Sequence, residues 1–542
     1  MKIIMNKTII SSMVQTACYA FAAVLLTASC ANDDATQNDK EQKTEVPAGT
    51  TAFSGFSQQG SATRTAIVDH TKGAGASVNW SSTDKIWVKD DAGTWNQSGA
   101  VTFPTSNKAK GVFALNGTYS KATHDVVYTN KAVVAGAQPQ VEIKSAQTQS
   151  APNNFDHAGE SGDCGIASAA KNGNDYDFTL NHKAAYLCFI PRSSNPYVNR
   201  SKLIKVEITA EDNIAGTYTI GANGDLTLVS GGSNTITVTT GSGFAIDNSS
   251  DDMSKNATYA VVAPGNHKFR IRYWLKNTTD HISETGVIAP IEGTITRYVD
   301  LNCTPGKVFD ITSKLTLADY DAHYYYLWDA KQNCWYGHEW DSAIPWQPTI
   351  NKQNRLPYYP TQSDPIRAYN PSYALNIQND AYSPYFKTLL NVNEMLWYTF
   401  NGDPHWDADE LWSTMGHLYK GGMWIKKKSK IPGFNNAYAP DGHDYRISEL
   451  NQENTNISYS KLSESEVSNY FYMPANGIYG LGEINSLGFA GWFWSSSAST
   501  GPTQGAAAYC LYFYSNAIIV TFQFRGYGMV ALPPENSNYT VQ

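Results

Sequence analysis

The sequence predicts a mainly β protein, with two tandem β-sandwich domains followed by an α+β domain at the C-terminal end. Short alternating apolar and polar runs, separated by Gly, Ser, Thr and Asn, fill the chain from about residue 50 to 316, and this spacing is typical of β-sandwiches. Ten of the fourteen tryptophans lie beyond residue 317, where helical signals first occur. We therefore expect domains over residues 51–168, 169–316 and 317–542.

The first 50 residues indicate export. Two lysines precede an apolar run over residues 17–26, and small residues follow it up to Cys30. This pattern is typical of a secretory signal peptide, expected here over residues 1–29. Residues 30–50 are polar with few large apolar side chains, which predicts a disordered tether.

Cys30 is the expected site of a lipid anchor. Residues 27–30 (TASC) resemble the lipobox of bacterial lipoproteins, in which the cysteine is acylated, although Thr27 stands where Leu is usual. The aspartates at 33 and 34 look like the tag that sends lipoproteins of gut and oral anaerobes to the outer face. The resemblance implies a palmitate-bearing lipoprotein of the cell outer membrane, anchored without spanning it. The alternative is an ordinary cleavage site with an unmodified cysteine.

Strand patterns recur along the whole chain. Residues 85–89, 203–208 and 268–274 alternate apolar and polar side chains, as half-buried strands do. Residues 509–514 and 518–524 alternate in the same way on either side of a Ser-Asn pair, which predicts a β-hairpin.

Two helices are predicted in the C-terminal domain. The first covers residues 393–400. The second begins at an acidic capping box, residues 407–410, and ends at the glycine pair 421–422. Apolar residues at positions 411, 415 and 418 would form its buried stripe.

Six short motifs in the first two domains resemble, in the same order, those of the fimbrillin family, the subunits of type V pili. They are residues 62–65 (ATRT), 78–80 (VNW), 84–88 (DKIWV), 178–185 (FTLNHKAA), 260–265 (AVVAPG) and 304–311 (TPGKVFDI). Phe309 stands where the family usually has Tyr. The resemblance implies two fimbrillin-like β-sandwiches and a role in a cell-surface fimbrium.

The C-terminal tail resembles the Fibrobacter major paralogous domain and related domains of C-type-lectin-like fold. The matching segments are residues 472–477 (YMPANG), 491–497 (GWFWSSS), 508–513 (AYCLYF) and 525–530 (RGYGMV). Ala531 replaces an arginine that usually follows the last motif. The resemblance implies a lectin-like shape, and carbohydrate binding is the function expected from it.

Aromatic side chains are the best candidates for ligand contact. Trp335, Tyr336, Trp340 and Trp346 lie in a loop-like stretch with few apolar partners, so they could stack on the apolar faces of sugar rings. The alternative is that they belong to the core, since a domain so rich in aromatic residues must bury many of them.

The cysteines and acidic residues leave two questions open. Five cysteines remain after the signal and the lipidated residue, without a CxxC pair, which argues against a structural zinc site and a disulfide-built fold. Cys334 and Cys510 share the last domain and either pair or stay free. Residues 403–410 hold four carboxylates that either bind calcium or cap a helix. We expect no metal and no cofactor.

Several function classes are excluded. The net charge is −8 and no long basic stretch occurs, so nucleic acid is not an expected partner. The sequence has no HExxH, GxSxG or Walker motif, and we do not expect an enzyme.

The function implied is that of a pilus subunit, expected at the tip as an adhesin. In the resembled family a protease removes the first strand, and a strand from another subunit fills the groove that is left. Residues 51–64 match such a removable strand, and Arg64 is the candidate cleavage site. About 220 residues follow the second sandwich, where stalk subunits end in a donor strand.

The expected partners are other pilus subunits, the outer membrane, and a glycan or protein on a host or bacterial surface. The alternative function is that of a non-polymerising surface lipoprotein that binds glycan through the same C-terminal domain.

Overall fold

The computed structural model describes residues 46–56, 66–73, 75–106, 108–361, 363–368, 380–500, 506–532 and 535. The predicted signal peptide, most of the tether, Cys30 and Arg64 lie outside these residues. The mainly β fold is confirmed, with 45% strand and 9% helix. No helix among the described residues is both long and apolar enough to cross a bilayer.

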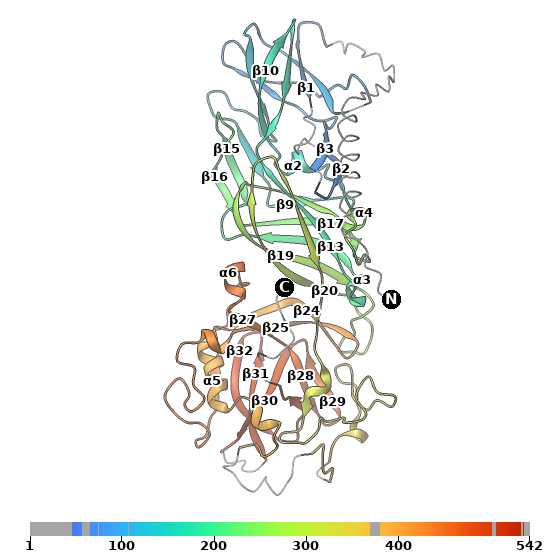
Figure 1. Ribbon diagram of the computed structural model, residues 1–542, viewed down its shortest axis with the longest axis vertical. Helices are drawn as coiled ribbons and strands as arrows, with labels where there is room; N and C mark the ends of the chain where they lie inside the picture. Colours follow the sequence, from blue (N-terminus) through green and yellow to red (C-terminus); the bar gives the residue numbers. More distant parts are fainter. Residues whose placement is uncertain are drawn as a thin grey trace, which may run out of the picture. The chain divides into compact units, whose positions relative to one another are not determined.

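The first domain is built on one sheet of eight strands, which includes β1 and β10 (Figure 1). The strand order is β5-β4-β7-β10-β11-β1-β6, and β12 pairs with β10. The strands are β1 (Thr51–Phe56), β4 (Trp87–Lys89), β5 (Trp95–Gln97), β6 (Lys110–Leu115), β7 (Thr123–Tyr128), β10 (Gly165–Asn172), β11 (Asp175–Thr179) and β12 (Asn181–His182). Their inward side chains share one apolar cluster with Trp80, which is fully buried.

The border between the first two domains differs from the predicted one. The predicted border at residue 168 falls inside β10, and β11 still belongs to the first sheet. Conversely, β8 (Gln140–Ile143) and β9 (Ala146–Thr148) pair with β15 (Ala215–Ile220) and β17 (Thr235–Ala245) of the second domain. Each of the two domains therefore contains strands from the other side of the predicted border. Composition did not reveal this border because strand pairing depends on partners far along the chain.

The second domain contains a sheet of order β18-β13-β21, another of order β16-β15-β8, and part of a nine-stranded sheet. Its remaining strands are β13 (Ala185–Arg192), β14 (Lys202–Thr209), β16 (Leu226–Ser233), β18 (Thr258–Val262), β19 (Gly265–Asn277), β20 (Ile291–Cys303) and β21 (Val308–Lys314). One-turn helices α2 (Ala158–Ser161), α3 (Pro196–Asn199) and α4 (Met253–Asn256) lie between strands. The segments predicted at 203–208 and 268–274 are strands β14 and β19.

The nine-stranded sheet runs from the second domain into the C-terminal domain. Its order is β27-β25-β24-β20-β19-β14-β17-β9, with β22 beside β24. The strands from the C-terminal domain are β22 (Ala318–Asp319), β24 (His405–Thr414), β25 (His417–Lys426) and β27 (Tyr470–Pro474). The two domains meet where Thr294 of β20 pairs with Glu410 of β24.

The rest of the C-terminal domain is a second sheet with small helices around it. Its order is β23-β33-β30-β31-β32-β26, and β28 joins β29 and β30. The strands are β23 (Tyr325–Tyr326), β26 (Gln452–Asn454), β28 (Asn476–Gly480), β29 (Glu483–Leu487), β30 (Ala490–Ala498), β31 (Ala507–Tyr514), β32 (Ala517–Phe524) and β33 (Met529–Val530). The helices are α5 (Val392–Asn401), α6 (Glu464–Val467) and the 3₁₀ turns η1 (Ala322–Tyr324), η2 (Leu356–Tyr358), η3 (Phe386–Thr388) and η4 (Lys428–Lys430).

Two predictions for this domain are confirmed. The helix predicted over residues 393–400 is α5, which begins at an Asn391 N-cap with Glu394 completing a capping box. The predicted C-terminal hairpin is β31 and β32, with Tyr514 opposite Ala517 across the turn.

The second predicted helix is wrong. Residues 405–426 form the antiparallel hairpin β24–β25, in which Thr414 lies opposite His417. Met415 and Gly416 have φ angles of 49° and 79°, the left-handed pair that a tight two-residue hairpin turn needs and that no right-handed helix contains. Residues 407–410 therefore cap no helix.

Candidate functional site

Strand β1 lies inside the first sheet although it is the first strand of the described chain. It runs antiparallel to β6, with Phe53 opposite Phe113, and parallel to β11, with Phe53 opposite Tyr176. Both of its edges are therefore paired with backbone from later in the sequence. If β1 were removed, β6 and β11 would be left with unpaired edges facing each other across a strand-wide gap.

The side chains around β1 determine which residue sizes fit at two of its positions. Phe53 is fully buried, stacked on Tyr176 with ring centroids 4.8 Å apart and in edge contact with Tyr119 at 5.0 Å. Two residues later on the same face, a Cβ atom on Gly55 would lie 2.7 Å from Phe178 and 2.9 Å from Trp80. The position of β1 in the sheet therefore requires a large apolar residue at position 53 and glycine at position 55.

Four aromatic residues of the C-terminal domain are candidates for ligand contact, and they differ in how far they are exposed. Trp335 follows the alternative and belongs to the core, since it is 0% exposed and packs on Tyr479 at 4.5 Å between ring centroids. Tyr336 is 49% exposed. Trp340 and Trp346 are half-buried against the core of the domain. The four side chains thus do not form one exposed surface.

Trp346 is already stacked within the protein. Its ring lies nearly parallel to that of His338 at 3.4 Å and to that of Tyr358 at 5.1 Å between centroids. The guanidinium of Arg367 lies 5.2 Å from the same ring. A sugar would compete with these side chains for the indole faces, so Tyr336 is the most accessible of the four candidates.

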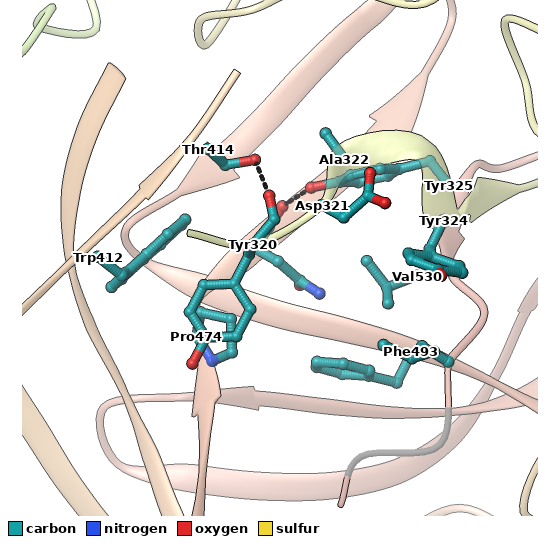
Figure 2. A pocket seen from close by; sticks show the side chains of 12 residues that line it. Tyr320, Asp321, Ala322, Tyr324, Tyr325, Trp412, Thr414, Pro474, Phe493 and Val530 are labelled. Atoms are coloured by element: carbon teal, nitrogen blue, oxygen red, sulfur yellow. Dashed lines mark hydrogen bonds between the residues drawn. The ribbon is translucent and has the colours of Figure 1, made fainter. Parts of the chain in front are cut away.

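A small cavity in the C-terminal domain is lined mainly by aromatic and apolar residues (Figure 2). It lies beside Tyr320, whose carbonyl accepts a hydrogen bond from the Thr414 hydroxyl at 2.7 Å. Its volume is about 90 Å³, below the roughly 300–1,000 Å³ of typical ligand pockets. A larger hollow of about 700 Å³ is lined by residues of the first two domains, including Trp95 and Ile220. The described lining of either contains none of the four predicted aromatic residues.

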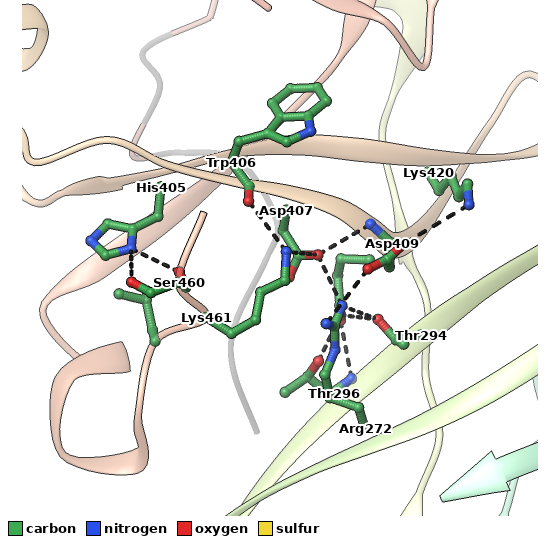
Figure 3. A network of polar contacts seen from close by, with 12 residues as sticks. Arg272, Thr294, Thr296, His405, Trp406, Asp407, Asp409, Lys420, Ser460 and Lys461 are labelled. Carbon is green, nitrogen blue, oxygen red and sulfur yellow. Dashed lines mark hydrogen bonds and ion pairs between the residues drawn. The ribbon is translucent and has the colours of Figure 1, made fainter. Parts of the chain in front are cut away.

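The acidic residues 403–410 contact protein cations and hydroxyl groups. Asp407 accepts from Arg272 Nη2 at 2.9 Å and lies 3.0 Å from Lys461 Nζ (Figure 3). Glu410 accepts from the Thr294 hydroxyl at 2.9 Å. Asp407, Asp409 and Glu410 contact side chains of the second domain, so they join the two domains. Asp403 instead pairs with Lys426 and accepts from the Tyr470 hydroxyl inside the C-terminal domain.

This network is almost completely buried. The side chains of Arg272 and Asp407 are 3% and 6% exposed. Burial alone would raise the pKa of Asp407, but Arg272 and Lys461 hold it below its usual value. The Asp407 carboxylate is therefore charged at neutral pH, and removing one partner of the pair would leave a buried charge at the domain contact.

All five described cysteines are free and buried. Cys334 and Cys510 belong to different apolar clusters and are not paired. Cys188 lies in β13 with no exposure.

Comparison with known proteins finds only distant likenesses. No family model and no curated protein matches the sequence. A "putative cell adhesion protein" of Bacteroides ovatus is 11% identical with a TM-score of 0.30, over 49% of this chain and 91% of that one. Another, of Bacteroides uniformis, is 14% identical with a TM-score of 0.29, over 49% and 94%. The fimbrial anchor protein Mfa2 of Porphyromonas gingivalis is 9% identical with a TM-score of 0.23, over 49% and 90%.

Proposed function

We propose that this chain is a cell-surface fimbrial subunit that receives a strand from a neighbouring subunit after its own β1 is removed, and that it acts at the fimbrial tip as an adhesin. The observation that carries the proposal is the position of β1, which is the first strand of the described residues yet is paired on both edges. No catalytic role is part of this proposal.

The connection after β1 supports removal of the strand. Residues 57–65, which include Arg64, link β1 to β2 (Ala66–Thr71). A cut in this link would leave β1 held by non-covalent contacts alone. A strand from another subunit could then replace it, with main-chain hydrogen bonds to β6 and β11 supplying affinity and the Phe53 and Gly55 positions supplying selectivity.

The C-terminal domain supports a terminal position in the fimbrium. After β21, the chain enters this domain directly through β22, which pairs with β24. The buried pair of Arg272 and Asp407 then holds the domain against β19. A segment fixed in this way is poorly suited to extend into the groove of another subunit, whereas a tip subunit needs only to accept a strand.

Cys30→Ser is expected to release the protein from membranes. Without the thiol, the acyl chains that hold the exported chain at the outer membrane have no attachment site. Membrane fractionation and labelling with a fatty-acid analogue measure this directly. Cys303→Ser, which changes a buried cysteine of β20, is the matched control and should leave labelling unchanged. Unchanged retention and labelling of the Cys30 variant would contradict the lipid anchor.

Arg64→Ala is expected to block incorporation into fimbriae, because β1 then stays covalently attached and fills the groove. The measurement is incubation with an arginine-specific protease, followed by a search for a ladder of subunits on gels. Arg64→Lys is the matched variant, since it keeps the positive charge but removes the arginine that the protease recognises. Its incorporation into fimbriae should be blocked to the same extent.

Normal incorporation of both Arg64 variants would place the cut elsewhere or show that the chain does not polymerise. A stable monomer that binds a glycan array after protease treatment would favour the non-polymerising glycan-binding lipoprotein instead.

A further inference from the structure

The two-stranded hairpin of β2 and β3 (Gly75–Asn79) lies in the sequence between β1 and Trp80 of the first domain, yet it contacts the second domain. Its turn is held in two places. The Lys72 ammonium pairs with the carboxylate of Asp251, and the Gly73 amide donates to Asp310 Oδ2 at 2.8 Å. The hairpin is therefore docked on strand β21 of the second domain and does not pair with the sheet of the first domain.

Three side chains with metal-ligand atoms meet under this hairpin. His70 comes from β2, Cys188 from β13 and Asp310 from β21, and Cys188 and Asp310 lie side by side in the parallel β13–β21 pair. The three ligand atoms all lie within 4.8 Å of one another. His70 and Cys188 are buried, and the side chain of Asp310 is 16% exposed.

The hydrogen bonds around His70 leave two acceptor atoms facing each other. The Tyr259 hydroxyl donates its single hydrogen to Asn153 Oδ1 at 2.6 Å. The 2.9 Å contact between His70 Nδ1 and that hydroxyl therefore places a hydrogen on Nδ1. In the neutral ring, the Nε2 lone pair then faces Asp310 Oδ1 at 3.3 Å, and among the described residues no nitrogen or oxygen atom donates a hydrogen bond to this buried oxygen. Besides the Gly73 amide, the neighbouring Cys188 thiol is the donor left to the Asp310 carboxyl.

A positive charge between these atoms would remove the repulsion. A second proton on the ring is one source of that charge, and it would serve His70 and Asp310 alone. A bound cation is the other source, and it would use the thiolate of Cys188 as well.

We propose that His70 Nε2, Cys188 Sγ and Asp310 Oδ1 bind a divalent cation of the zinc class, with the fourth position open to water. Imidazole, thiolate and carboxylate together suit Zn²⁺, which takes all three in tetrahedral sites. With bonds of about 2.0–2.3 Å, such an ion holds its ligand atoms roughly 3.5 Å apart. The 3.3 Å separation of Nε2 and Oδ1 fits this spacing.

The site would fasten the hairpin to the second domain. Residue 70 lies shortly after the predicted cut at Arg64, so the cation would hold the segment that follows the cut on β13 and β21. The proposal does not depend on fimbrial assembly, because it rests only on the contacts of residues 70, 153, 188, 259 and 310.

The test is a titration of the full exported chain with Co²⁺ after removal of metals by a chelator. A cobalt ion bound to a thiolate gives a ligand-to-metal charge-transfer band in the near ultraviolet, so the band reports coordination by cysteine. We expect about one Co²⁺ per chain with this band, its displacement by Zn²⁺, and a higher melting temperature with Zn²⁺ present.

Three variants show whether Co²⁺ binds at this site or elsewhere on the chain. Cys188→Ser should abolish the band, and Asp310→Asn should weaken Co²⁺ binding at least tenfold, whereas Cys303→Ser should leave both unchanged. Circular dichroism of each variant checks folding, and Asp310→Asn keeps the test decisive if Cys188→Ser does not fold. Absence of the band in the wild-type chain, or binding that is unchanged in Asp310→Asn, would overturn the proposal.

Discussion

Asp407→Ala is expected to destabilise the contact between the second and C-terminal domains by about 3 to 5 kcal/mol, because it removes the carboxylate that is hydrogen-bonded to the buried Arg272 and leaves only the more distant Asp409, at 3.7 Å. The cost comes mainly from the uncompensated charge, so Arg272→Met combined with Asp407→Leu should recover most of the loss. Denaturant unfolding, followed by tryptophan fluorescence, measures the free energy of unfolding of each variant.

An exposed ion pair provides the control. Lys276 and Glu292 lie 2.9 Å apart with side chains 44% and 47% exposed. Glu292→Ala should therefore change the free energy of unfolding by no more than about 1 kcal/mol. Equal effects of the Asp407 and Glu292 variants would mean that the domain contact does not depend on the buried pair.

The same ion pair predicts acid sensitivity. Asp407 has a pKa below its usual value of about 3.9, so its contribution is fully present above that pH and is lost as the pH falls through the lower folded value. The wild-type protein should lose stability below about pH 4, and the Asp407→Ala variant should lack this part of the loss.

The fold class and the strands at 203–208, 268–274, 509–514 and 518–524 could be predicted because they depend on local patterns. The alternation at 268–274 places Phe269, Ile271 and Tyr273 on one buried face of β19, as the structure shows. The helix predicted through Met415 failed because apolar spacing at 411, 415 and 418 also fits two strands joined by a turn. The Met-Gly pair at the turn was the signal that could have distinguished them.

The functional contacts could not be predicted because they join residues far apart in the sequence. Arg272 and Asp407 are 135 positions apart, and Gly73 and Asp310 are 237 apart. Neither pair has a local motif. Arg272, Asp407 and Asp310 resemble ordinary polar residues of a strand, and Gly73 resembles an ordinary turn residue. Gly55 is similar, because the side chains that leave no room for a Cβ atom there belong to Trp80 and Phe178 and not to its neighbours in the chain.

Trp335→Ala is expected to destabilise the C-terminal domain by about 3 to 5 kcal/mol, the usual cost of removing a buried indole. The ring is packed against Tyr325 at 5.7 Å and Tyr479 at 4.5 Å between centroids, so its loss leaves a cavity that these rigid rings cannot fill. Thermal unfolding and glycan-array binding, measured on the same samples, separate a loss of stability from a loss of ligand contact.

Tyr336→Ala is the matched control, because the neighbouring side chain is 49% exposed. Its removal should change the free energy of unfolding by only about 0.5 kcal/mol. If Tyr336 contacts a ligand by stacking, the same change should weaken binding by roughly 1 to 3 kcal/mol, as for other stacked or anchoring aromatic residues. A Trp335→Ala variant that melts like the wild type but binds less ligand would instead place the indole at the surface, and the packing of Trp335 described above would be wrong.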